Sequence, residues 1–261
     1  MSGKTLAAAA ALICLIAPSG ARAQFNQYWL PVEQAVVDSH IDVQLQYSRF
    51  DDPHDVADNT DSVAVLSVEA QYAFKDRFEV GLGIPVLAFN YGTGVTQEED
   101  TGFGNLMLNL KARLFGLGDT LSVAAYTNVM LPTHSNADER DYAMVLAGGA
   151  VSAKLLGIRL GGALGAIWLI SGGFDVALMN VDLYAGYSFF GVLTLKLAAQ
   201  FAKGFHPGGY EYEAFALTPG VEVDLLDIIR VGVAARIATN EDAEALYLGR
   251  ATLLAHAGIS F

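Results

Sequence analysis

Apolar and polar residues alternate along most of this chain, and this period of two constrains its fold more than any other feature. Between Ile41 and Tyr47 the odd positions are apolar and the even ones polar, and the pattern returns throughout the sequence. Successive side chains of a β-strand point to opposite faces, so each such segment has one apolar and one polar face. We predict twelve strands, at residues 37–49, 62–74, 78–89, 103–115, 120–131, 142–155, 158–169, 177–189, 192–203, 213–224, 229–238 and 247–261.

The predicted strands have the length and connections of strands that cross a membrane. A spanning strand needs ~9–11 residues, with one face towards lipid. Tight turns alternate with longer polar connections. The longer connections are at 50–61, 90–102, 132–141, 170–176, 204–212 and 239–246. Lipid offers no partner to an open strand edge, so the sheet has to close. We therefore predict an all-β fold, a closed antiparallel transmembrane β-barrel of about twelve strands. A soluble sandwich is the alternative, and ten or fourteen strands stay open because residues 143–165 are small and apolar on both faces.

Composition excludes several other classes of protein. Only 16% of residues are charged, against about 25% in typical soluble domains, and 53% are hydrophobic. This hydrophobicity argues against disorder, and a net charge of −13 argues against nucleic-acid binding, which needs a basic surface. No stretch after the N-terminus has 18 uninterrupted apolar residues, so we expect no membrane-spanning helices.

The N-terminus has the features of a secretory signal. Lys4 precedes an apolar run over residues 6–17, and Ala21-Arg22-Ala23 forms a small-x-small cleavage site. We predict a cleaved signal peptide at 1–23, a short periplasmic lead-in at 24–36 and the barrel at 37–261. The single cysteine, Cys14, lies in the signal, so no disulfide is expected. The lead-in is too short for a full plug, and an interfacial position through Tyr28 and Trp29 is favoured over one inside the barrel.

The C-terminus supports an outer-membrane location. Alternation continues to the last residue, Phe261, and outer-membrane barrels are similar in ending on an aromatic residue that their assembly machinery reads. We expect the bacterial outer membrane as the location. The expected partners are outer-membrane lipid, lipopolysaccharide, the barrel assembly machinery and a small-molecule solute, with no nucleic acid.

Charge follows the predicted topology. Acidic residues gather in the long connections, where they form an extracellular mouth that either is a solvated rim or attracts cations: Asp51, Asp52, Asp55, Glu98, Glu99, Asp100, Asp138, Glu139, Glu241, Asp242 and Glu244. Strand parity places a second set inside the barrel as constriction candidates: Glu79, Lys111, Arg113, Lys154, Arg159, Asp182, Lys196, Glu222, Arg230 and Arg236. Five of the basic ones lie towards the periplasmic end. They either line a constriction there or form a salt-bridge network with Glu79 and Glu222 that closes the interior.

Motifs for catalysis and metal binding are weak. The histidines after the signal are His40, His134, His206 and His256, and they form no spaced metal pair. His134 near Asp138, and His256 four residues before Ser260, lack the third group that a hydrolase needs. We expect no cofactor, no metal and no enzymatic activity, with a hydrolase kept as an alternative.

Two stretches resemble a known family. Gly102–Leu114 is similar to the G-x-G-D-x-x-x-x-x-K-Y/A-R strand of the meta-pathway phenol-degradation (MetA-pathway) family of outer-membrane proteins, with Asn105 in place of Asp. Met130–His134 resembles that family's Leu-Pro-Thr-Gly corner, with His134 in place of Gly. The family is distantly similar to fatty-acid and aromatic-hydrocarbon transport barrels. The resemblance implies a channel for passive uptake of small solutes, aromatic or apolar ones among them. A closed structural or adhesive barrel is the alternative.

Overall fold

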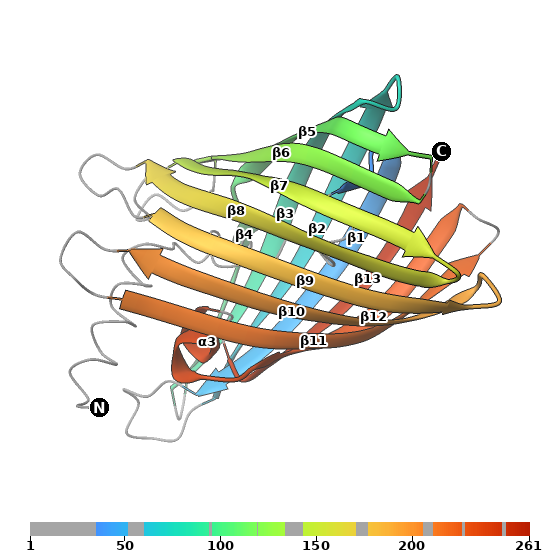
Figure 1. Ribbon diagram of the computed structural model, residues 1–261. Coiled ribbons are helices and arrows are strands. Elements are labelled where there is room, and N and C mark those ends of the chain that lie inside the picture. The colour runs from blue at the N-terminus through green and yellow to red at the C-terminus, as the bar shows by residue number, and fades with distance from the viewer. Residues whose placement is uncertain are drawn as a thin grey trace.

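The structure is a computed structural model in which residues 35–51, 60–93, 96–118, 120–133, 143–170, 177–205, 211–225, 228–246 and 249–261 are described. Strands dominate it (Figure 1): β1 (His40–Asp51), β2 (Thr60–Phe74), β3 (Phe78–Thr93), β4 (Thr96–Phe103), β5 (Leu106–Leu117), β6 (Leu121–Leu131), β7 (Ala143–Leu155), β8 (Ile158–Ile170), β9 (Ala177–Phe189), β10 (Leu193–Phe205), β11 (Glu211–Leu225), β12 (Ile229–Ala238) and β13 (Ala251–Ser260). A short helix, α3 (Glu241–Leu246), precedes β13. Among the described residues, no helix is long and apolar enough to cross a membrane.

The strands close into a ring. Apart from β4 and β5, each strand pairs antiparallel with its neighbours in sequence, and β1 pairs with both β2 and β13. β3 pairs with β5 over Phe78–Gly83 and with β4 over Val86–Thr93, so β4 and β5 together form one barrel strand interrupted at Gly104 and Asn105. The result is the predicted closed barrel of 12 antiparallel strands. The soluble sandwich and the counts of ten and fourteen are therefore wrong.

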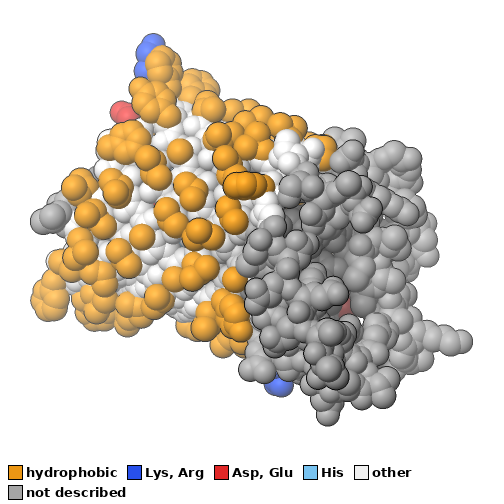
Figure 2. All heavy atoms as spheres, turned by 180° about the vertical axis from the view of Figure 1, so that it is seen from behind, with side chains coloured by type: hydrophobic (Ala, Val, Ile, Leu, Met, Phe, Trp, Pro, Cys, Tyr) orange, Lys and Arg blue, Asp and Glu red, His pale blue; other side chains and the backbone are white. Residues whose placement is uncertain are grey.

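The two faces of each strand differ as predicted. On β6 the even positions from Ser122 to Met130 are buried and the odd ones are not, and on β10 the same alternation separates inward Lys196 from outward Leu197. Figure 2 shows hydrophobic side chains spread over the barrel wall and charged ones near its rims. Such an outer face is compatible with lipid, because apolar side chains are well solvated by acyl chains and charged side chains there destabilise the barrel.

Tight turns join the strands at one end. Lys75 and Asp76 have φ of 52° and 53°, and Leu156 and Gly157 have φ of 51° and 82°. Two successive positive φ angles define the type I′ turn, whose twist matches that of antiparallel strands. These turns lie where the sequence predicted them. Following the usual orientation of outer-membrane barrels, we call this end periplasmic and the opposite end extracellular.

Two predicted connections contain regular structure. Most of the predicted loop at 90–102 is strand, because β3 continues to Thr93 and β4 begins at Thr96. The predicted loop at 239–246 contains α3, and the last strand begins at Ala251 rather than at 247. Asn240 accounts for the helix, since its Oδ1 accepts a hydrogen bond from the Ala243 amide (3.1 Å) and so caps the first turn.

Candidate functional site

The inward faces of the strands line a barrel interior that is charged towards the periplasmic end and contains an apolar cluster towards the extracellular end. All ten predicted constriction residues lie on inward-facing positions. An inward position does not show that a residue lines a conducting path, so their role in a constriction stays a prediction. Their contacts define three groups.

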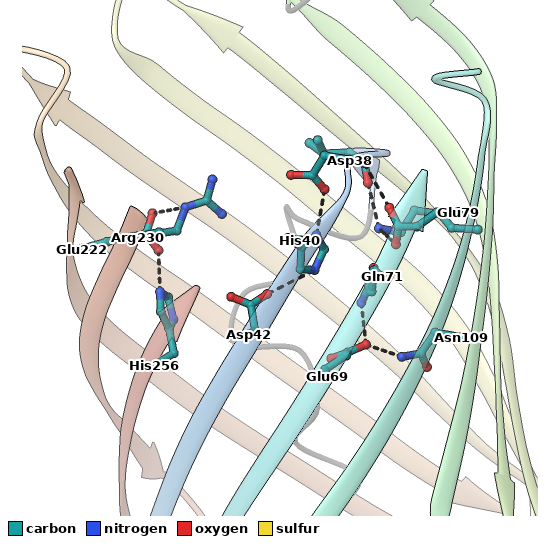
Figure 3. Close-up of polar contacts among 12 residues, drawn as sticks. Asp38, His40, Asp42, Glu69, Gln71, Glu79, Asn109, Glu222, Arg230 and His256 are labelled. Atoms are coloured by element: carbon teal, nitrogen blue, oxygen red, sulfur yellow. Dashed lines mark hydrogen bonds and ion pairs between the residues drawn. The ribbon is translucent and has the colours of Figure 1, made fainter. Parts of the chain in front are cut away.

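The first group centres on Glu222 of β11, which is fully buried. Its carboxylate pairs with Lys196 of β10, whose side chain is 1% exposed. It also lies 3.5 Å from Arg230 Nε and 3.4 Å from His256 Nε2 (Figure 3). Asp224, one inward position nearer the periplasmic end, is 3.3 Å from Arg230 Nε and accepts its hydrogen bond. Two carboxylates therefore neutralise most of the positive charge on this side.

The second group joins the chain's N-terminal residues to the barrel wall. Glu79 and Lys111, opposite each other on β3 and β5, form an ion pair of 2.7 Å. Lys111 Nζ also donates to the Val36 carbonyl (2.7 Å), and Glu79 Oε2 accepts from the Asp38 amide (3.2 Å). Ser122 Oγ donates to the carbonyl of Ala35 (2.6 Å). We call residues 35–39 the lumen segment, since Ala35 is fully buried against inward side chains of β6, β7 and β8.

The lumen segment bears on the predicted lead-in. The two described residues of the lead-in, Ala35 and Val36, lie inside the barrel. From the sequence, an interfacial position was favoured over this one. The rest of the lead-in, with Tyr28 and Trp29, and the signal at 1–23 lie outside the described residues.

The third group is a mid-barrel chain of polar contacts around Asp182 of β9. Asn180 Nδ2 donates to its carboxylate (2.9 Å), and Gln200 also hydrogen-bonds to it. Gln200 Oε1 in turn accepts from Arg236 Nε (2.7 Å). Arg236 is only 1% exposed and keeps its charge inside the barrel through these contacts.

Parity places several polar residues inward that the candidate set omitted. His40 lies between Asp38 and Asp42, at 3.1 Å from a carboxylate oxygen of each. Glu69 accepts hydrogen bonds from Gln71 and Asn109. The alternation that identified Glu79 and Lys111 applies equally to these residues, so their inward direction was predictable, although their contacts were not.

Three cations near the periplasmic end have few partners. Arg113 of β5, Lys154 of β7 and Arg159 of β8 face inward, and we call them the basic arc. Among the described residues, the one carboxylate within 4.0 Å of the arc is Asp224, at 4.0 Å from Arg159. The Nε atoms of Arg113 and Arg159 are buried and have no hydrogen-bond partner in the described part of the chain.

The extracellular half of the interior contains an apolar cluster on the strands β5 to β12. Inward residues from β5 to β12 pack with Ala243 of α3 into one buried cluster, which we call the apolar layer: Met107, Met130, Met144, Ile167, Leu178, Ala202, Ala214, Ala216, Ala238 and Ala243. The helix α3 thus folds over this part of the barrel interior (Figure 1).

Glycines on β7 and β8 make room for an inward tyrosine. A Cβ atom on Gly148 would come within 2.7 Å of the Tyr126 hydroxyl, and one on Gly165 within 2.9 Å. These strands are rich in small residues, and at these two positions the missing side chains leave space inside the barrel. In the structure that space is filled, at these two positions, by the side chain of Tyr126.

The acidic mouth is described only in part. Glu241, Asp242 and Glu244 lie on α3, and Asp242 accepts a hydrogen bond from the Glu213 amide (2.9 Å). The remaining members lie outside the described residues or on strand segments whose side chains are not described: Asp51, Asp52, Asp55, Glu98, Glu99, Asp100, Asp138 and Glu139. Cation attraction by this mouth stays a prediction.

The histidines and carboxylates weighed from sequence for metal binding or catalysis are placed only in part. In the described part of the chain, no group of three or more His, Cys, Asp or Glu residues could hold a metal ion. His256 faces Glu222, and His134 and His206 lie outside the described residues.

The two stretches that resemble a known family contact each other. The Thr133 amide donates to Asn105 Oδ1 (3.0 Å), and the Leu106 amide donates to Thr133 Oγ1 (2.8 Å). Asn105 lies at the break between β4 and β5, where ladder hydrogen bonds are interrupted. The motif residues therefore close this break by side-chain hydrogen bonds to backbone amides.

Comparison with solved structures finds outer-membrane barrels. The COG4313 outer membrane channel from Pseudomonas putida F1 has a TM-score of 0.63 and 14% identity, over 86% of this chain and 96% of that one. The NanC porin has a TM-score of 0.55 and 10% identity, over 85% and 98% of the two chains. The KdgM porin, in complex with disordered oligogalacturonate, has a TM-score of 0.52 and 7% identity, over 85% and 99%.

These similarities establish the fold of outer-membrane channels and, at such low identity, the fold alone. No protein-family model and no curated protein sequence matches this chain. Membership of the phenol-degradation family is therefore not confirmed.

Proposed function

We propose that this protein is a channel of the bacterial outer membrane for passive uptake of small solutes, with aromatic or apolar ones preferred. The apolar layer carries the proposal. It places three methionines, Met107, Met130 and Met144, on the inward faces of neighbouring strands, where a barrel that passes only water and ions needs polar side chains. Methionine is polarizable and adaptable, and it makes favourable contacts with aromatic rings.

The order of the layers supports the direction of transport. A solute entering from outside meets the apolar layer first and the charged periplasmic half afterwards. Contact with apolar side chains lowers the free energy of an apolar solute in the upper half, and the polar lower half favours its release to the periplasm. The similarity in fold to three outer-membrane channels supports the same role.

One observation favours a closed structural or adhesive barrel as a second candidate. Glu222 and Arg236 are 0% and 1% exposed, so charged side chains fill part of the interior. A barrel of ~12 strands lies between those filled by side chains and those that leave an aqueous channel.

Planar-bilayer recording of the refolded chain 24–261 tests the proposal. We expect steady current steps in KCl and uptake of toluene-sized solutes into vesicles that contain the protein. Folded, inserted barrels that pass neither ions nor apolar solutes would favour the closed barrel. Insertion is checked independently by the fluorescence of Trp168, which is outward-facing on β8 and 45% exposed.

A further inference from the structure

Charge is unevenly distributed between the walls of the barrel interior. The strands β5 to β8 contribute Lys111, Arg113, Lys154 and Arg159, and none of these four strands contains an acidic residue. The inward carboxylates lie elsewhere, on β1 to β3, on β9 and on β11. One wall is therefore cationic, and it stays so unless other strands reach across to neutralise it.

Neutralisation from other strands is incomplete. Glu79 reaches Lys111 at 2.7 Å and pairs with it. The basic arc receives much less, because its closest described carboxylate oxygen is 4.0 Å from Arg159, and Asp224, which carries that oxygen, also accepts a hydrogen bond from Arg230. Arg113 and Lys154 have no carboxylate within 4.0 Å among the described residues. Among the described residues, positive charge in excess thus remains at the periplasmic end of this wall.

Hydrogen-bond donors without a partner indicate the kind of ligand that the basic arc can bind. The Nε–H groups of Arg113 and Arg159 are both buried without a hydrogen-bond partner among the described residues. Buried donors of this kind are uncommon, and each calls for a partner. A guanidinium presents its donors as a planar fork that matches the two oxygens of a carboxylate.

The arc lies at the periplasmic end. Lys154 and Arg159 are directly opposite each other on β7 and β8, two residues from the tight turn at Leu156 and Gly157. Arg113 lies beside Gly116, where an added Cβ would be 3.3 Å from Arg113 Cδ, and its backbone amide bonds to Arg77 near the next turn. All three cations are therefore near one exit of the barrel.

The same strands carry the apolar layer at their opposite ends. β5 has Met107 before Arg113, β7 has Met144 before Lys154, and β8 has Ile167 after Arg159. Each of these strands thus presents to the interior an apolar side chain near its extracellular end and a cation near its periplasmic end. A solute that contacts both in one passage needs an apolar body and an anionic group.

We propose that the basic arc binds the carboxylate of a small monocarboxylate with an apolar body, and so selects such anions among the solutes of the channel. This inference rests on the proposed function. The chain as a whole has a net charge of −13 and repels anions, so a local excess of positive charge is what lets a carboxylate cross this interior.

The test uses benzoate as the probe, with benzamide as its neutral analogue and acetate as the carboxylate without an apolar body. Each is added to the KCl solution in planar-bilayer recordings, and the concentration that halves the current is measured. We expect block by benzoate well below the concentrations at which benzamide or acetate act. In Arg113→Gln/Arg159→Gln the half-blocking concentration of benzoate rises about tenfold, because charge-assisted hydrogen bonds are lost.

Two further variants keep the result interpretable. Lys154→Gln changes an exposed residue of the arc, so it folds without disturbing buried contacts, and it is expected to weaken the benzoate block in the same direction. Lys203→Gln, whose partner Glu213 lies at the extracellular end, is the matched control and leaves the block unchanged. Equal block by benzamide, or the same half-blocking concentration in all variants, would overturn the proposal.

Failure of the channel itself gives a different result. If the folded barrel carries no current, the proposed function fails, and benzoate binding is then measured by calorimetry in detergent. Binding that Arg113→Gln/Arg159→Gln abolishes would retain the carboxylate site without transport. Absence of binding to the unaltered barrel would remove the site as well.

Discussion

Removal of Lys196 tests how much the buried charges of the interior contribute to stability. The side chains of Lys196 and Glu222 are 1% and 0% exposed and form an ion pair. Lys196→Met keeps the length and volume of the side chain but leaves Glu222 with one cation fewer inside the barrel. Breaking a buried pair by removing one partner costs about 3–5 kcal/mol. Arg230 and His256, at 3.5 Å and 3.4 Å from Glu222, offset part of this, so we expect a loss of about 3 kcal/mol.

The loss is measured by urea unfolding of the refolded barrel in detergent or lipid, followed by tryptophan fluorescence. Trp168 reports the outer surface directly, because it faces outward on β8. Lys203→Met is the matched control, since it removes the same side chain from a pair whose partner, Glu213, is 54% exposed. An exposed pair contributes only about 0–1 kcal/mol, so the control should unfold close to the unaltered protein.

A double variant separates the pair from its surroundings. Lys196→Met/Glu222→Leu removes both charges, and Arg230 keeps Asp224 as a partner at 3.3 Å. We expect it to be more stable than the sum of the single changes predicts, with a coupling energy of about 1–3 kcal/mol. The reasoning is refuted if Lys196→Met unfolds within about 1 kcal/mol of Lys203→Met, a difference typical of exposed pairs alone.

Two other changes test the packing inside the barrel. Gly148→Ala is expected to lower the free energy of unfolding by about 1–3 kcal/mol in the same urea assay, because its Cβ meets the Tyr126 hydroxyl at 2.7 Å and a backbone oxygen. Gly149→Ala is the control, since its Cβ has no atom closer than 3.8 Å, and equal losses of stability in both variants would contradict this packing. Deletion of residues 24–38 is expected to raise single-channel conductance, since Ala35 and Val37 are buried inside the barrel; an unchanged conductance in the folded, shortened chain would show that the lumen segment does not narrow the conducting path.

The strands and their faces could be predicted from the sequence because both depend on neighbouring residues. Alternation from Leu193 to Phe201 identifies β10 and sends Lys196 inward without knowledge of any other strand. Even the ambiguous 142–155 and 158–169 fall within one residue of β7 and β8. The helix α3 was missed because it is six residues long, too short for a helical period to show.

Beyond the general expectation that Glu79 and Glu222 pair with inward cations, individual contacts inside the barrel could not be predicted, because parity gives the face of a residue and not its height or angle. Glu79 meets Lys111 because β3 and β5 place them directly opposite each other, a register that depends on the break at Gly104 and Asn105. Arg236 of β12 reaches Gln200 of β10 across the intervening strand β11, a contact that depends on the height and direction of both side chains. The division between paired cations and the basic arc follows from such contacts.

The position of the lumen segment follows from closure of the barrel and from the hydrogen bonds of its backbone. Closure pairs β1 with β13, and the Phe261 amide bonds to the Ser39 carbonyl (3.0 Å), so the residues before β1 begin at the rim of the interior. Outside the barrel their carbonyls face water, and inside they need protein donors. Lys111 and Ser122 supply these to Val36 and Ala35. The charge that lines the interior therefore also holds the segment that occupies it, so Lys111→Met removes both the ion pair with Glu79 and the hydrogen bond to Val36.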